Sequence, residues 1–149
     1  MPKSQRMIAN SKEKAEFRRV ILKETISRCN QAIKAGYYLE AITLMESLIA
    51  DRLESRALYL NKKNASFQTL FNLCGLLNDD EFLSYIIPDI REWSQRRNAA
   101  LHTLAKIDDN NMVSFDQKYS VTKETARQGM QIFRRIDRAL KQSRRVMKK

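Results

Sequence analysis

The sequence predicts an all-α fold, an up-and-down helical bundle of about five helices, from three observations. Only three glycines and two prolines occur among 149 residues, so turn-forming residues are scarce. Leu, Ala, Lys, Arg, Glu and Gln dominate the composition, and these residue types favour helix. Apolar residues recur at helical spacing, and no segment shows the pattern of a strand. Short connections between the helices favour antiparallel neighbours.

The first predicted helix begins at Ser11, because serine is a preferred residue at helix N-termini. Gly36 suits the end of this helix, since glycine is the usual residue just past a helix. We expect residues 1–10 to be a flexible N-terminal segment. Residues 11–147 are then a single helical domain, and residues 148–149 are a basic tail.

The second predicted helix spans about residues 37–61 and ends at a polar break. Ser66 is predicted to cap a shorter third helix. The fourth helix spans about residues 89–106, and Pro88 before it suits the first turn of a helix. Connections of a few residues separate these segments.

The remaining segments are a brief helical turn, a loop and a long last helix. The turn is predicted over residues 81–87. Residues 108–117 are predicted to be a loop, because Asp, Asn and Ser side chains compete for backbone hydrogen bonds. Thr122 is predicted to cap the last helix, which runs to about Met147.

The charge pattern favours a polyanionic partner. The formal net charge is +11 and the pI is near 9.9. Such an excess favours RNA, DNA, an anionic membrane or an acidic protein. Basic residues of the last helix recur on one face, where we expect them to bind RNA phosphates, although a solvated basic face is the simpler interpretation. They are Arg127, Arg134, Arg138, Lys141, Arg145 and Lys148.

Several kinds of site find no support in the sequence. Cys29 and Cys74 lie far apart, so we interpret them as buried apolar residues and expect no metal site. The acidic run at residues 79–81 favours helix capping over Mg²⁺ binding. No phosphate-binding or nucleophile-elbow motif occurs, so no cofactor is expected. Without a secretory or membrane-spanning segment, we expect a cytoplasmic protein with no membrane partner.

The only histidine, His102, lies five residues after Arg97 in the fourth helix. On a helical wheel Arg97 falls within the apolar stripe, and His102 lies about 140° round from it. A buried, unpaired arginine is costly, so Arg97 needs a carboxylate, an aromatic face or a subunit interface. We expect Glu46 to orient Arg97 or Arg52, and Trp93 to stack on Arg97.

The segment Arg97-Asn98-Ala99-Ala100-Leu101-His102 resembles the Arg-polar-x3-His motif of the HEPN superfamily, and the resemblance extends over residues 11–147. It implies a HEPN-like bundle and a metal-independent endoribonuclease assembled from two copies of the chain. Arg97, Asn98 and His102 would be its catalytic residues. Members of the superfamily act as toxins, in antiphage defence and in RNA processing. Some members have lost catalytic activity and retain only a binding function. Toxins paired with nucleotidyltransferase antitoxins carry Tyr where this chain has Leu104.

The chemistry of RNA cleavage without a metal fits these residue types. The 2′-OH attacks the phosphate, and the unperturbed pKa of histidine suits the two proton transfers. Arginine offers a planar fork to the phosphate oxygens. Because one chain has one histidine, two histidines require a homodimer. The expected products carry a 2′,3′-cyclic phosphate, and chelators should not inhibit.

The sequence therefore predicts a homodimeric endoribonuclease of toxin or antiphage-defence type. Its expected partners are RNA, a second copy, and an antitoxin or regulatory protein. A different class is a non-catalytic basic helical module that binds nucleic acid or an acidic partner protein. A third is a structural adaptor in which Arg97 only holds helices together.

Overall fold

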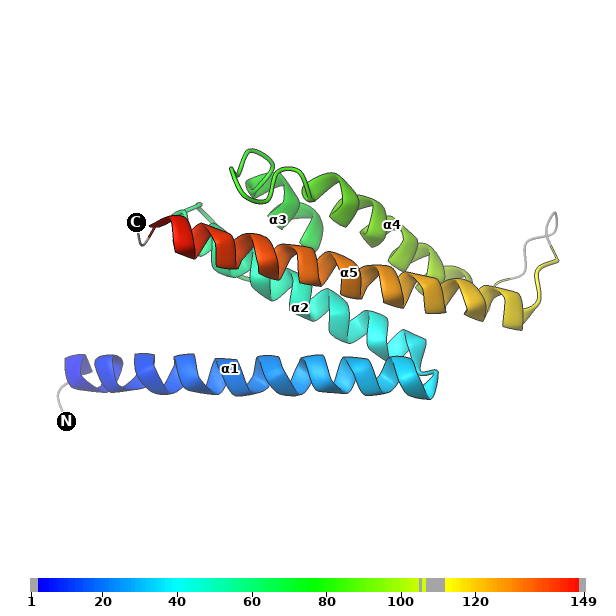
Figure 1. The fold of residues 1–149 in the computed structure, drawn as a ribbon, viewed down its shortest axis with the longest axis horizontal. Coiled ribbons are helices and arrows are strands. Elements are labelled where there is room, and N and C mark those ends of the chain that lie inside the picture. Colours follow the sequence, from blue (N-terminus) through cyan, green and yellow to red (C-terminus); the bar gives the residue numbers. More distant parts are fainter. Residues whose placement is uncertain (1–2, 105, 107–111, 148–149) are drawn as a thin grey trace.

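The computed structural model describes residues 3–104, 106 and 112–147. The described residues form an all-α bundle of five helices without a strand, which confirms the predicted fold class (Figure 1). None of these helices is both long enough and apolar enough to cross a membrane. The helices are α1 (Lys3–Ala35), α2 (Tyr38–Tyr59), α3 (Leu70–Leu76), α4 (Ile87–Thr103) and α5 (Phe115–Met147).

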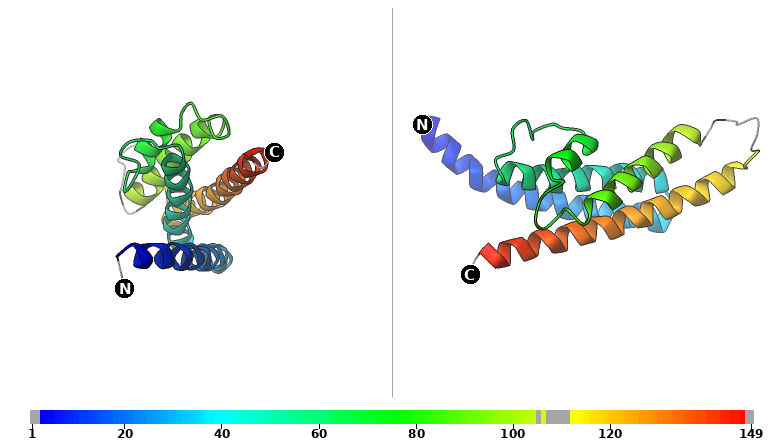
Figure 2. Two further views of the ribbon diagram at one scale, coloured as in Figure 1. Left: turned by 90° about the vertical axis from the view of Figure 1, so that its left-hand side faces the viewer. Right: turned by 90° about the horizontal axis from the view of Figure 1, so that it is seen from above.

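Helix α2 is the centre of the bundle, with α1 and α4 on opposite sides of it (Figure 2). The pairs α1–α2 and α4–α5 are antiparallel (Figure 1). Only residues 36–37 separate α1 from α2, and so short a connection favours this arrangement. Helix α2 packs against α1, α3 and α5, and α4 packs chiefly against α5 and α3. The core lies where α2, α4 and α5 meet. Its largest fully buried side chains include Ile42, Met45, Ile49, Leu53, Ile90, Trp93 and Ile136.

Gly129 of α5 allows the three central helices to approach closely. A Cβ atom at Gly129 would lie 2.7 Å from Met45 Cγ and 2.8 Å from Trp93 Cζ2. Trp93 is fully buried, and its indole N–H donates to the carbonyl oxygen of Thr125 at 2.8 Å. The indole is thus held between α4 and α5 by packing on one side and by a hydrogen bond on the other.

The long helices begin earlier than predicted. Helix α1 begins at Lys3 and not at Ser11; the flexibility expected of residues 1–10 remains a prediction. Helix α5 begins at Phe115, because the preceding residue Ser114 forms a reciprocal cap with Gln117. The Gln117 N–H donates to Ser114 Oγ at 3.2 Å, and the Ser114 N–H donates to Gln117 Oε1 at 3.1 Å. The cap predicted at Thr122 is wrong, since that residue is buried inside α5.

The other boundaries follow the same capping chemistry. The cap predicted at Ser66 is wrong: Thr69 caps α3 and its hydroxyl accepts from the Asn72 N–H at 3.2 Å. Gly36 ends α1 with a φ of 85°, as a C-terminal glycine does, and Pro88 lies in the first turn of α4. Both of these predictions are confirmed. Residues 108–111 of the predicted loop, and the basic tail 148–149, lie outside the described residues.

A buried ion pair anchors the turns between α3 and α4 to α2. Arg56 donates to Asp80 Oδ1 at 3.0 Å, with both side chains less than a tenth exposed. The other carboxylate oxygen accepts from the N–H groups of Phe82 and Leu83, so Asp80 caps the following turns as the acidic run predicted. The Arg56 guanidinium also lies over the Tyr59 and Phe82 rings. Residues 81–86 are hydrogen-bonded turns.

Candidate functional site

Arg97 is held by the carboxylate that the sequence suggested. Arg97 Nη1 lies 2.7 Å from Glu46 Oε2, which joins α4 to α2. The side chains are 17% and 30% exposed, so the pair is only partly shielded from water. Arg97 Nε is buried and has no hydrogen-bond partner in the described part of the chain. Glu46 thus fixes one edge of the guanidinium while another donor stays unused.

The rest of the predicted supporting network is not formed. Trp93 is drawn into the core beside Gly129, and no cation–π contact joins it to Arg97 among the described residues. Arg52 pairs with its neighbour Asp51 at 3.0 Å and has no ion pair with Glu46 in the described structure. The support for Arg97 is therefore one carboxylate.

His102 lies exposed in the last turn of α4. The imidazole forms no hydrogen bond or ion pair with the residues that the structure describes, and the residue as a whole is exposed. Lys118 of α5 donates to the carbonyl oxygen of Thr103 at 2.9 Å, which ties the end of α4 to its neighbour. An imidazole in this position can exchange protons with water or with a bound molecule.

The helical wheel places Ile90, Trp93, Arg97, Leu101 and Leu104 on one stripe, but the core-facing stripe of α4 in the structure is rotated from this one. Leu101 is 39% exposed, whereas Ala100 is buried, so the stripe passes through Trp93 and Ala100. Arg97 lies at the edge of this stripe, and Asn98 beside it is exposed. Because about 140° of helix separates Arg97 from His102, the two side chains leave α4 in different directions. One chain alone does not bring both to the same point.

The basic face of α5 is exposed over the residues that the structure describes. Arg127, Arg134, Arg138 and Arg145 are exposed and form no ion pair among the described residues. Lys141 is also exposed but pairs with Asp137 at 2.9 Å, and Lys148 lies outside the described residues. The opposite side of α5 is apolar and packs into the core, apart from Met147, which is 62% exposed. Its buried residues include Ala126, Met130, Phe133, Ile136 and Leu140.

A pocket that the sequence analysis missed lies between the C-terminal ends of α2 and α5. It has a volume of about 300 Å³ and is lined by three arginines, Arg52, Arg56 and Arg144, together with Tyr59 and Leu140. The only sequence signal is that Arg52 and Arg56 lie one turn apart on α2. Because Arg52 and Arg56 already have carboxylate partners, the charge free to meet a ligand there is mainly that of Arg144.

The described residues contain no cluster of three or more His, Cys, Asp or Glu side chains that could hold a metal ion. Burial raises the pKa of both Cys29 and Cys74 from the ordinary 9.0 to about 11, and Arg91 partly offsets this rise at Cys74. Both thiols are therefore protonated near neutral pH and are poor nucleophiles. Comparisons with models of protein families, with curated proteins and with solved structures found no match to this chain.

Proposed function

We propose that the protein is a metal-independent endoribonuclease of the HEPN type, active as a homodimer. The contrast between Arg97 and His102 carries this proposal. Glu46 holds the Arg97 guanidinium at 2.7 Å, partly buried, whereas the only histidine is exposed in the last turn of the same helix. An oriented cation suits a phosphate, and an accessible imidazole suits proton transfer.

The reaction uses the RNA's own 2′-OH as the nucleophile. His102 of one protomer takes the 2′-OH proton, the 2′-oxygen bonds to phosphorus, and the bond from phosphorus to the 5′-oxygen breaks. His102 of the second protomer gives a proton to the leaving 5′-oxygen. Arg97 stabilises the negative charge on the phosphate oxygens during attack. The products are a 2′,3′-cyclic phosphate and a 5′-hydroxyl.

The second copy is needed because each chain has one histidine, and the Arg97 side chain leaves α4 in a different direction from that histidine. The C-terminal half of α4 carries an exposed Leu101 beside His102, and α1 lies on the far side of α2 from it. A two-fold axis across this part of α4 would bring two copies of His102 and of Arg97 into one cleft.

The test compares RNA cleavage by matched variants in excess EDTA. His102→Ala should lower the rate by about 10²-fold or more, since general acid–base catalysis contributes factors of this size. Arg97→Ala should be similarly impaired. Arg96→Ala is the control: it removes the neighbouring, exposed arginine, whose partner is Glu92. Equal cleavage by the wild type and by His102→Ala would overturn the proposal.

Glu46 is proposed as a positioning residue. Glu46→Gln should lower kcat more than it raises KM, because a misplaced guanidinium still attracts RNA but stabilises the reacting phosphate poorly. Glu46→Asp, which keeps the charge, should restore part of the rate. Full activity of Glu46→Gln would show that the ion pair has only a structural role.

The biological role that we propose, a toxin or defence ribonuclease with an antitoxin or regulatory partner, rests on the motif resemblance. Induced expression of the wild-type gene should then stop growth, and His102→Ala should relieve the effect. Growth unaffected by an expressed enzyme that cleaves RNA in vitro would argue against a toxin and favour RNA processing.

The exposed arginines of α5 favour a second candidate, a non-catalytic module that binds nucleic acid or an acidic protein. In that case RNA would be retarded in a gel by both the wild type and His102→Ala, without cleavage. Binding should weaken steeply between two salt concentrations. Loss of stability on Arg97→Ala with no effect on RNA would instead favour the structural adaptor.

A further inference from the structure

A groove beside the N-terminal half of α4 contributes no residue to the reaction proposed above. It lies between residues 60–69, α3 and α4, and has a volume of about 450 Å³. Two cations, three amide side chains and one aromatic ring contribute to its lining, which contains no carboxylate. These residues are Lys63, Asn64, Gln68, Phe71, Asn72 and Arg91.

The aromatic ring of this groove is unusually exposed. Phe71 lines the groove and is 74% exposed. Phe67, in the loop four residues earlier, does not line the groove and is fully exposed. Phe67 has a φ of 58°, a left-handed conformation that is rare for a bulky residue. Its N–H donates to Glu54 Oε1 at 3.3 Å, which helps to hold the loop in this conformation. Exposed rings of this kind provide stacking surfaces for unpaired bases.

The amide groups beside Phe71 can recognise the edge of a base. Asn72 Nδ2 donates to Gln68 Oε1 at 2.9 Å, which fixes the two side chains relative to each other. The Gln68 NH₂ group and the Asn72 Oδ1 atom stay available as a donor and an acceptor, because no hydrogen bond of the described residues uses them. Paired donors and acceptors on amides match base edges.

The cations supply a site for a phosphate. Arg91 lines the groove, and its buried Nε has no hydrogen-bond partner in the described part of the chain. Lys63 is exposed and forms no ion pair among the described residues, whereas Lys62 lies 3.8 Å from Asp79. A guanidinium beside an aromatic ring is a common setting for a nucleotide.

The groove is also in line with His102. Arg91, Gln95, Asn98 and His102 are spaced by four, three and four residues, so they share one stripe of α4. At about 1.5 Å per residue, Arg91 and His102 lie roughly 16 Å apart along the helix, a distance that a few unpaired nucleotides can span. Gln95 and Asn98 between them are exposed and polar.

We propose that this groove binds an unpaired base and an adjacent phosphate of single-stranded RNA, with the chain continuing along α4 toward His102. The base stacks on Phe71, Gln68 and Asn72 bond to its edge, and Arg91 and Lys63 bind the phosphate. The inference rests on the proposed function, because it takes the RNA substrate from it. It specifies that this substrate is single-stranded.

The test measures binding separately from cleavage. A fluorescein-labelled single-stranded octauridylate is titrated against the full-length His102→Ala protein by fluorescence anisotropy. Adding Phe71→Ala should weaken binding roughly tenfold, as expected for the loss of one stacked base. Lys63→Gln should reduce the slope of log Kd against log salt by about one. A duplex of the same length should bind less tightly and should not respond to Phe71→Ala.

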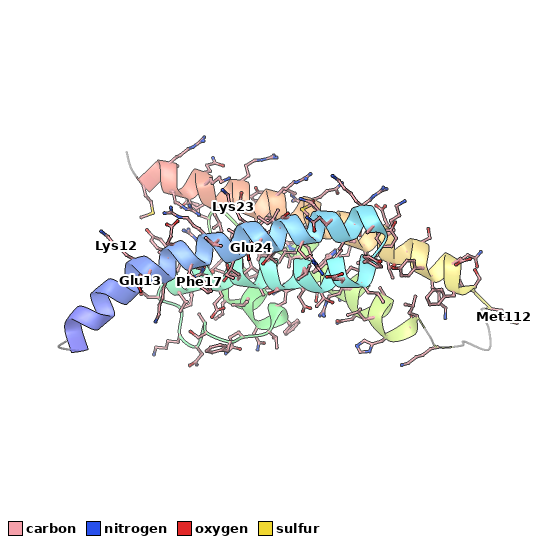
Figure 3. All side chains as sticks on the ribbon, turned by 90° about the horizontal axis from the view of Figure 1, so that it is seen from below. Lys12, Glu13, Phe17, Lys23, Glu24 and Met112 are labelled. Carbon is pink, nitrogen blue, oxygen red and sulfur yellow. The ribbon has the colours of Figure 1, made fainter. Side chains whose placement is uncertain are left out.

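Phe17→Ala is the matched control, because Phe17 is a similarly exposed phenylalanine on α1, the helix nearest the viewer in Figure 3. It should bind as tightly as the background protein. Unchanged affinity on Phe71→Ala, with an unchanged thermal melt, would overturn the inference even if the wild type cleaves RNA. Weakened binding on Phe71→Ala without cleavage by the wild type would support the groove while refuting the ribonuclease.

Discussion

Replacing Gly129 by alanine should destabilise the protein, although alanine is the better helix former. A Cβ at this position would lie 2.7 Å from Met45 Cγ, and 2.8 and 2.9 Å from two indole atoms of Trp93. Met45 is flexible and can move away in part. Trp93 is not free to move, because it is fully buried and hydrogen-bonded to Thr125.

Two opposing contributions determine the size of the effect. Alanine in place of glycine in a helix interior stabilises by about 1 kcal/mol. Forcing an extra methyl group into a packed core costs about 1–3 kcal/mol, and contacts below 3.0 Å with a fixed ring place Gly129 at the upper end. We therefore expect Gly129→Ala to lower the free energy of unfolding by about 1–2 kcal/mol, or Tm by roughly 4 °C for a chain of this size.

Urea denaturation followed by circular dichroism measures this difference. Gly75→Ala in α3 is the control, because nothing lies within 4 Å of the position where its Cβ would be. That variant should be unchanged or more stable by up to about 1 kcal/mol. If Gly129→Ala were stabilised as much as Gly75→Ala, the close approach of the three helices at Gly129 would be refuted.

Three further predictions concern buried or capping groups. Asp80→Ala should lower the free energy of unfolding by about 3–5 kcal/mol in urea denaturation, because it leaves the Arg56 charge buried and unpaired; a loss below 1 kcal/mol would contradict the buried pair. The pKa of about 11 for Cys29 and Cys74 lies above the ordinary 9.0, so the folded thiols retain their protons longer than the unfolded ones. The free energy of unfolding should not change through these thiols below pH 9, and between pH 9 and 11 it should fall by about 1.4 kcal/mol per thiol per pH unit. Denaturation curves at pH 8 and 10 should therefore show a smaller fall for Cys29→Ala and for Cys74→Ala than for the wild type. An equal fall in the variants and the wild type would refute the assignment. Ser114→Ala should lower the free energy of unfolding by about 1 kcal/mol, because it removes the cap of α5. Thr122→Ser keeps the hydroxyl of the residue that the sequence predicted as the cap. Hydrogen exchange should show that the start of α5 is unchanged in this variant.

The helices were predictable because their main signal is local. Scarce glycine and the spacing of apolar residues are enough to indicate α1, α2, α4 and α5. Their starting points were less predictable, because several hydroxyl residues compete to cap each helix. Ser114 forms a cap since Gln117 can reciprocate, whereas Thr122 becomes buried once α5 packs against α2 and α4.

That Arg97 needs a partner follows from the amino-acid sequence alone, because an arginine in an apolar stripe is costly whatever the fold. Packing between distant segments selects Glu46 as that partner, turns Trp93 into the core beside Gly129, and pairs Arg56 with Asp80. The groove beside Phe71 also depends on tertiary packing, since it brings a loop, α3 and α4 together. Helical periodicity fixes which residues share a face, but the neighbour of each face is set by packing between segments far apart in the chain.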